Sequence, residues 1–138
     1  MRLRAKALIV LAAAVLFVLP LASQQQPAPK PDYAPLVGVW ALEVNAGGEY
    51  YYLTLEFKLT EGKIEGALSE QNGAFTNIPA SNIEWDNTVL KFDFKSPTPP
   101  DGVERLIKSE FKSVNGKLEG MMTVPELGMS VPVTGTKK

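Results

Sequence analysis

One stretch of this chain occurs twice, and this repeat constrains the fold more than any other feature of the sequence. The first copy contains Glu56-Phe57-Lys58, Gly62-Lys63-Ile64-Glu65-Gly66 and Ile78-Pro79. The second copy contains Glu110-Phe111-Lys112, Gly116-Lys117-Leu118-Glu119-Gly120 and Val131-Pro132. The blocks are spaced so alike that the copies differ by one residue in an intervening loop. The pattern indicates a duplicated β-unit, with two independently arisen hairpin exits as the alternative.

Short alternations of apolar and polar residues recur about every ten residues, which is typical of strands, and no window has a helical period. We predict eight strands, over residues 37–44, 50–59, 63–70, 75–85, 89–95, 103–114, 117–124 and 129–136. Pro79 cannot donate a hydrogen bond to a neighbouring strand. The fourth strand should therefore be bulged or edge-like at that residue.

The connections between these strands fall into two sets. Tight turns are predicted at Thr60-Glu61-Gly62, Asp86-Asn87 and Asn115-Gly116, because Gly and Asn readily adopt positive φ. Longer connections are predicted over residues 45–49, 71–74, 96–102 and 125–128. Alternate connections of an up-and-down meander lie at opposite ends. The tight turns should therefore gather at one end and the longer loops at the other.

These features predict an all-β fold, an eight-stranded antiparallel up-and-down β-barrel with an internal half-barrel duplication. A closed barrel leaves no exposed sheet edge, while a two-sheet β-sandwich is the alternative. The matching strands 50–59 and 103–114 are four places apart in the predicted order. In a ring of eight strands, the two copies would therefore lie on opposite walls.

The N-terminus has the order of a secretory signal peptide. Basic residues at Arg2, Arg4 and Lys6 precede an apolar run over residues 7–19 and the small pair Ala22-Ser23. We predict a signal peptide over residues 1–23, with a retained anchor as the alternative. A Pro/Gln-rich disordered leader follows over residues 24–35, and the β-barrel domain spans residues 36–138. The protein is then exported, to the periplasm or beyond the cell.

Composition excludes several function classes. Without the three basic residues of the signal peptide, the 14 Lys and Arg fall to 11 against 15 Asp and Glu, which disfavours nucleic acid. The absence of His and Cys excludes His-assisted Ser or Cys nucleophiles, disulfides and ordinary zinc or copper sites. A hydrolase using carboxylates such as Glu43 or Glu70 is the remaining enzymatic hypothesis. We predict a non-enzymatic monomer with no cofactor and no metal.

Alternation of inward and outward positions gives a set of candidate ligand-binding residues. They are Tyr51, Glu70, Trp85, Phe92, Arg105 and Met122. Arg105 is placed either to pair with the anionic head group of an apolar ligand or to be an ordinary rim arginine, solvated or paired with Glu70. An eight-stranded barrel is wide enough either to fill with side chains or to hold one small ligand. Gly66 and Gly120 lie at inward positions and have two interpretations. Glycine lets a strand coil sharply as a small barrel closes, or the two missing side chains leave an internal cavity.

A second hypothesis places the activity on the outside of the domain. Tyr50 and Tyr52 should point outward, where they form either a contact patch for an exported partner or cross-strand pairs. Together with the leader and the longer loops, they would make a protein-interaction or enzyme-inhibitor module.

Gly38-Val39-Trp40, at the start of the first strand, resembles the Gly-x-Trp signature of lipocalins and the wider calycin group of β-barrels. The resemblance implies that Trp40 plugs the closed end of the barrel and that the long-loop end takes a small apolar or amphiphilic ligand. The chain over residues 36–138 is also similar to small bacterial exported domains with paired Gly-Lys-Leu-x-Gly hairpins. Its Pro-rich arm resembles that of the bacterial metalloprotease inhibitors.

Overall fold

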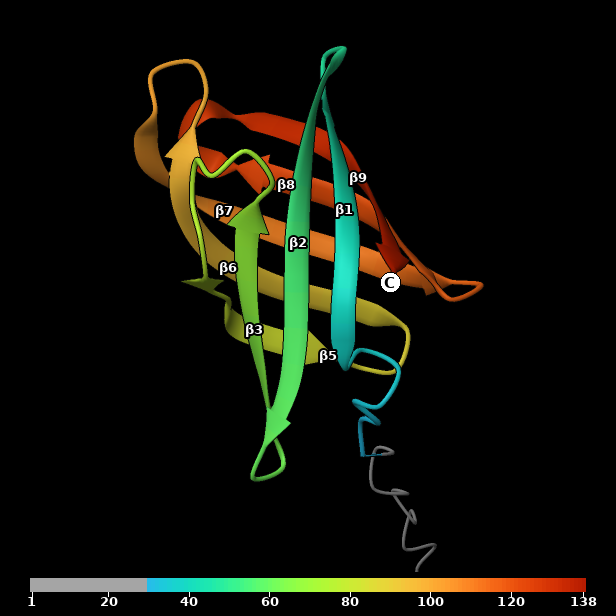
Figure 1. Ribbon diagram of the computed structural model, residues 1–138. Coiled ribbons are helices and arrows are strands. Elements are labelled where there is room, and N and C mark those ends of the chain that lie inside the picture. The colour runs from blue at the N-terminus through green and yellow to red at the C-terminus, as the bar shows by residue number, and fades with distance from the viewer. Residues whose placement is uncertain (1–29) are drawn as a thin grey trace, which may run out of the picture.

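A computed structural model describes residues 30–138, which form one antiparallel β-barrel (Figure 1). The predicted signal peptide and most of the predicted leader lie outside the described residues. The strands are β1 (Gly38–Ala46), β2 (Glu49–Thr60), β3 (Lys63–Glu70), β4 (Ile78–Pro79), β5 (Ser81–Trp85), β6 (Val89–Thr98), β7 (Val103–Val114), β8 (Lys117–Val124) and β9 (Met129–Lys137). A short 3-10 helix, η1 (Pro125–Leu127), precedes β9.

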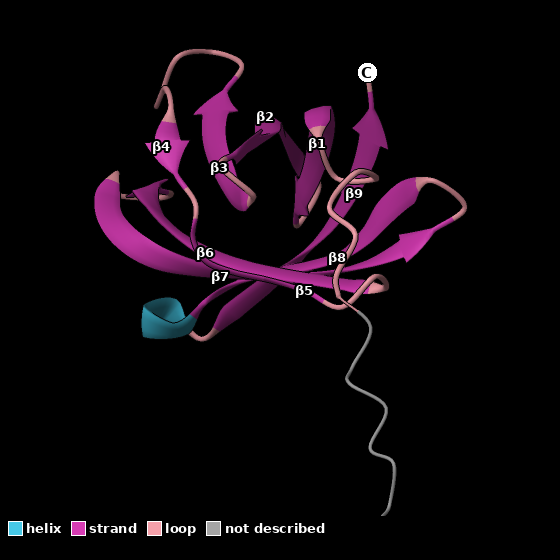
Figure 2. Ribbon diagram, turned by 90° about the horizontal axis from the view of Figure 1, so that it is seen from below, coloured by secondary structure: helices cyan, strands magenta, loops and turns pink. Residues whose placement is uncertain are grey.

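The strand order in the sheet is β4-β3-β2-β1-β9-β8-β7-β6-β5. Because β1 pairs with both β2 and β9, the first and last strands are joined within the sheet. The two outermost strands, β4 and β5, follow each other directly in the chain, so the sheet curls into a nearly closed barrel (Figures 1 and 2). The predicted all-β barrel is confirmed, and the sandwich alternative is excluded.

The strand predicted over residues 75–85 is divided into β4 and β5, so there are nine strands where eight were expected. β4 pairs with β3, whereas β5 pairs with β6. Between them, Ala80 donates its backbone N–H to the carbonyl of Gly66 at 2.8 Å. The division follows Pro79, which has no N–H for a ladder, and it is the irregularity expected there.

The two copies of the repeat form hairpins with the same register. Phe57 lies opposite Gly66 in the β2–β3 hairpin, and Phe111 lies opposite Gly120 in the β7–β8 hairpin. A Lys–Glu pair follows one position further along in both hairpins. The hairpins occupy opposite walls of the barrel, as the repeat predicted (Figure 2).

One end of the barrel is closed by tight turns and by the segment before β1. Glu61, Asn87 and Asn115 adopt positive φ in the three predicted turns. Trp40 is 3% exposed and its Nε1 donates to the carbonyl of Leu36 at 2.8 Å. Tyr33 also packs against the core. The segment directly before β1 therefore contributes to the closed end.

The closed half of the barrel is filled with side chains. A layer that we call the floor consists of Phe57, Phe92 and Phe111. Ring centroids are 6.2 Å apart for Phe57 and Phe92 and 5.9 Å apart for Phe92 and Phe111. All three rings are at most 1% exposed. The floor joins the two copies of the repeat through a phenylalanine of β6.

Gly66 and Gly120 allow close packing beside this floor. A Cβ on Gly66 would lie 2.9 Å from Cε1 of Phe57, and a Cβ on Gly120 would overlap the backbone carbonyl of Glu110. Neighbouring atoms fill the space that each missing side chain would take, so neither glycine opens a cavity.

Candidate functional site

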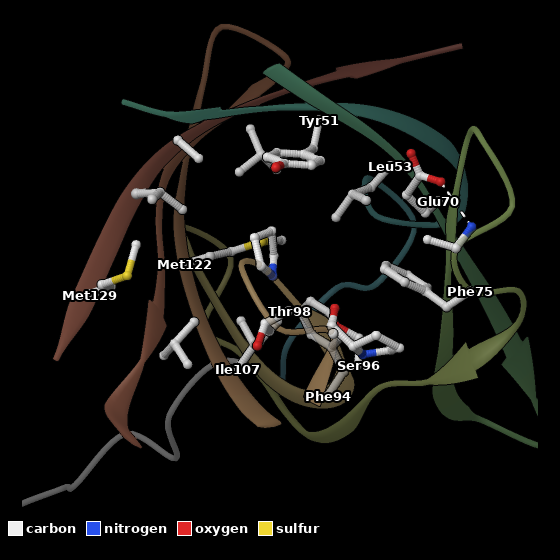
Figure 3. A pocket seen from close by; sticks show the side chains of 18 of the residues that line it. Tyr51, Leu53, Glu70, Phe75, Phe94, Ser96, Thr98, Ile107, Met122 and Met129 are labelled. Atoms are coloured by element: carbon white, nitrogen blue, oxygen red, sulfur yellow. Dashed lines mark hydrogen bonds between the residues drawn. The ribbon is translucent and has the colours of Figure 1, made fainter. Parts of the chain in front are cut away.

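The other half of the barrel is hollow and open at the end opposite Trp40. The cavity has a volume of about 580 Å³ (Figure 3). We call its open end the mouth, formed by the Gly47-Gly48 turn and residues 71–77, 99–102 and 125–128. The cavity is lined by Val44, Ala46, Tyr50, Tyr51, Leu53, Glu70, Asn72, Ala74, Phe75, Phe94, Ser96, Pro97, Thr98, Pro99, Pro100, Gly102, Ile107, Met122, Val124, Leu127, Met129 and Val131.

The mouth has three of the four longer connections that the sequence predicted. The fourth, expected over residues 45–49, is a two-residue turn in which Gly47 and Gly48 both have positive φ. This conformation lets β1 and β2 extend further than predicted, since glycine tolerates it without strain.

The cavity arises from a change in side-chain size along β6. Its inward positions carry large apolar residues as far as Phe94 and then continue with Ser96 and Thr98. The short side chains leave space above the floor where phenylalanine would fill it. β2 contributes Leu53 and β7 contributes Ile107 to the lining, so the walls stay apolar while the centre stays open (Figure 3).

Three of the six predicted site residues line the cavity, namely Tyr51, Glu70 and Met122. Two others lie below it. Phe92 belongs to the floor, and Trp85 is at the closed end, where its Nε1 donates to the carbonyl of Asp32 at 2.8 Å. Both were correctly predicted on the inner face, but alternation alone does not show how far along the barrel axis an inward residue lies. The structure therefore does not bring the six together.

Arg105 occupies an inward position near the mouth, yet its guanidinium does not line the cavity. Nη1 and Nη2 each donate to one oxygen of the Asp101 carboxylate at 2.7 Å, and Nη1 also donates to Oγ1 of Thr98. Its Nε is buried, lacks a hydrogen-bond partner and lies 3.7 Å from a carboxylate oxygen of Glu126. The predicted pairing of Arg105 with Glu70 is replaced by one with Asp101.

This ion pair fixes the charge of both groups. The hydrogen bonds from Arg105 hold the pKa of Asp101 well below its usual range, and the bonded carboxylate raises the pKa of Arg105. Two parallel N–H···O bonds to one carboxylate are a strong and directional arrangement. Arg105 therefore holds the 99–102 loop through Asp101 and has few N–H groups free to donate to a ligand.

Glu70 and Tyr51 are two of the polar side chains that line the cavity (Figure 3). Glu70 accepts a hydrogen bond from the backbone N–H of Ala74 at 3.0 Å, which ties the carboxylate to the 71–77 loop. The Tyr51 hydroxyl donates to a carboxylate oxygen of Glu49 at 3.0 Å. That hydrogen bond, aided by desolvation, raises the pKa of Tyr51.

Most of the remaining wall was missed by reasoning from sequence. Phe75, Leu127 and Met129 lie in or beside the loops of the mouth, where no alternation indicates which way a side chain points. Thr98 could have been found from the change to small residues along β6. Tyr50 was predicted to point outward; it is half exposed and also borders the cavity.

The described part of the chain holds no group of three or more carboxylates placed to bind a metal ion. Over residues 30–138 there is also no helix long and apolar enough to cross a membrane. Comparisons of the chain with protein-family models, with curated proteins and with solved structures each gave no match.

Proposed function

We propose that this protein is an exported, lipocalin-like binding protein that holds one small apolar or amphiphilic molecule in the open half of its barrel. The observation that carries the proposal is the cavity of about 580 Å³, which falls in the range of about 300–1,000 Å³ typical of small-molecule sites. Its wall is mostly apolar and its few polar groups lie toward the mouth. Such a wall takes an apolar tail and leaves a head group near water.

Displacement of a neutral, environment-sensitive dye such as Nile red tests this proposal. Neither Trp40 nor Trp85 lines the cavity, so dye emission is a better readout than intrinsic tryptophan fluorescence. We expect the dye to fluoresce with the protein and C12 amphiphiles to displace it. Bound ligand should also raise the melting temperature, because ligand that binds only the folded state stabilises it.

A pair of substitutions on one strand gives the matched control. Ile107 points into the cavity and is 8% exposed, while the adjacent Leu106 points outward and is 36% exposed. Ile107→Trp should fill the cavity and weaken dye binding at least tenfold, whereas Leu106→Trp should leave it unchanged. Equal dye binding by both variants would show that the dye binds elsewhere and would overturn the proposal.

The protein-interaction hypothesis stays a prediction. Tyr50 and Tyr52 are 50% and 47% exposed, which is compatible with a contact patch. The leader that was expected to contribute lies mostly outside the described residues. The cavity is the more specific feature, and we therefore favour the ligand-binding function.

A further inference from the structure

We propose that the cavity selects amphiphiles with a cationic head group, such as an alkylammonium ion, over those with a carboxylate head group. This inference rests on the proposed ligand-binding function and adds the chemical class of the ligand. It follows from the charges that the barrel presents at the mouth and from the aromatic rings beside them.

Among residues 30–138, Glu70 is the one charged residue that lines the cavity. Its carboxylate is held in place by the Ala74 N–H and lies beside Phe75 at the edge of the cavity (Figure 3). A second carboxylate, that of Glu49 at the start of β2, accepts a hydrogen bond from the Tyr51 hydroxyl at 3.0 Å and so also lies at the mouth. An anionic head group at the mouth would be repelled by both carboxylates, whereas a cation would be attracted by both.

The basic side chain nearest to the cavity cannot offset these carboxylates. Arg105 is bonded through two nitrogens to Asp101, and Glu126 approaches its third nitrogen. Together these three groups carry one net negative charge. The loops of the mouth thus neutralise the arginine that would otherwise attract an anion.

Lysines are also kept away from the interior. Lys95 and Lys108 neighbour cavity-lining positions on β6 and β7, but both side chains are exposed and occupy outward positions of their strands. No lysine is found in the cavity wall among the described residues. No lysine side chain in the cavity wall of the described residues therefore offsets the negative charge at the mouth.

Aromatic rings supply a second reason to favour a cation. Tyr51 and Phe75 line the cavity near Glu70, and Tyr50 borders it. The face of an aromatic ring attracts a cation, but it does not attract a carboxylate in the same way. An ammonium head group would therefore find a carboxylate and aromatic faces together, while its alkyl tail would reach down toward the floor.

The test is a Nile red displacement series at pH 7.5 with three C12 ligands, dodecyltrimethylammonium, dodecanol and laurate. The two ionic ligands are kept below their critical micelle concentrations and dodecanol below its solubility limit. We expect dodecyltrimethylammonium to bind about tenfold more tightly than dodecanol, and laurate to bind least tightly. If laurate binds as tightly as dodecyltrimethylammonium, the ligand class is wrong while cavity binding stands. If none of the three displaces the dye, the proposed function itself fails.

Two variants assign the selectivity to its residues. Glu70→Gln keeps an oxygen that can accept the Ala74 N–H, so it removes the charge without releasing the loop; it should reduce the preference for the cation several-fold. Glu119→Gln, an equal charge change at an exposed position of β8, is the control and should have no effect. Asp101→Asn should weaken the hold on Arg105 and strengthen laurate binding. An unchanged preference in Glu70→Gln would overturn the role of Glu70.

Discussion

The two copies of the repeat are equivalent in the closed half of the barrel and different in the open half. In the β2–β3 hairpin, Phe57 faces Gly66; in the β7–β8 hairpin, Phe111 faces Gly120 in the same register. Toward the mouth, the β2–β3 hairpin ends in Glu70, and Val124 takes the corresponding place in β8. The shared phenylalanines thus supply two of the three floor rings, while Glu70 and Val124, which differ, line the cavity.

Tyr51 and Arg105 are a second pair of matching positions that carry different residues, and this difference also concerns the cavity. Tyr51 has its ring at the cavity, whereas Arg105, at the matching position of β7, is withdrawn into an ion pair with Asp101. A duplication that left both walls alike would give a symmetric cavity. Divergence at the upper positions gives a cavity with one charged, aromatic side.

Loss of either of the two repeated floor phenylalanines, Phe57 or Phe111, should have the largest effect on stability and should test the equivalence of the copies. Phe57→Ala and Phe111→Ala each remove a ring that is at most 1% exposed. Each should lower the free energy of unfolding by about 3–5 kcal/mol, as is usual for a buried phenylalanine. Urea denaturation followed by circular dichroism measures both. A large cost for one copy and little for the other would break the comparison.

The two repeated glycines should differ in a way that the sequence alone does not reveal. A methyl group on Gly120 meets backbone atoms of β7, which cannot move aside, whereas one on Gly66 meets the edge of the Phe57 ring and the Ala80 side chain. We expect Gly120→Ala to cost about 3 kcal/mol and Gly66→Ala about 1 kcal/mol, since overpacking is tolerated where a side chain can shift. Thermal or urea unfolding of both variants decides this. A larger cost at Gly66 would contradict the packing described here.

A carboxylate placed in the second copy, at the position that matches Glu70, should strengthen the preference of the cavity for a cationic head group. Val124 lines the cavity at the position that matches Glu70. Val124→Glu should raise the affinity for dodecyltrimethylammonium about threefold, because it adds one more partly exposed charge at the mouth. Dye displacement measures the change. Tighter laurate binding by this variant would show that charge at the mouth does not govern selectivity.

The smallest expected effect concerns acid and the Arg105–Asp101 pair. The pKa of Asp101 is lowered in the folded state, so this carboxyl stabilises the fold above its unfolded-state pKa of about 3.9 and loses that contribution as the pH falls further. Melting temperatures measured from pH 5 to pH 2 should fall less steeply for Asp101→Asn than for the wild type. Parallel curves would mean that the pair contributes little.

The fold was accessible from the sequence because local signals agreed with one another. Alternation, turn residues and the repeat each indicated a barrel, and the Gly-x-Trp segment placed Trp40 at the closed end. The strand 75–85 was the exception, because pairing with two different neighbours on either side of Ala80 depends on how the barrel closes. No local pattern reports that geometry.

The site was predictable only in part. Alternation put Tyr51, Glu70 and Met122 on the inner face correctly, but it put Trp85 and Phe92 there as well, without showing that they lie below the cavity. The pairing of Arg105 with Asp101 was missed, because Asp101 lies in a loop whose path the sequence does not specify. Side-chain pairing across loops is set by tertiary structure.

The central claim is that the barrel is filled near its closed end and binds a ligand in its open half. Titration of the ¹⁵N-labelled protein with dodecyltrimethylammonium, followed by backbone amide chemical shifts, tests it most directly. We expect concentration-dependent shifts at Leu53, Glu70 and Ile107 and almost none at the closed-end turns around Gly62 and Gly116. Shifts confined to the outer face, or to the closed end, would contradict the account.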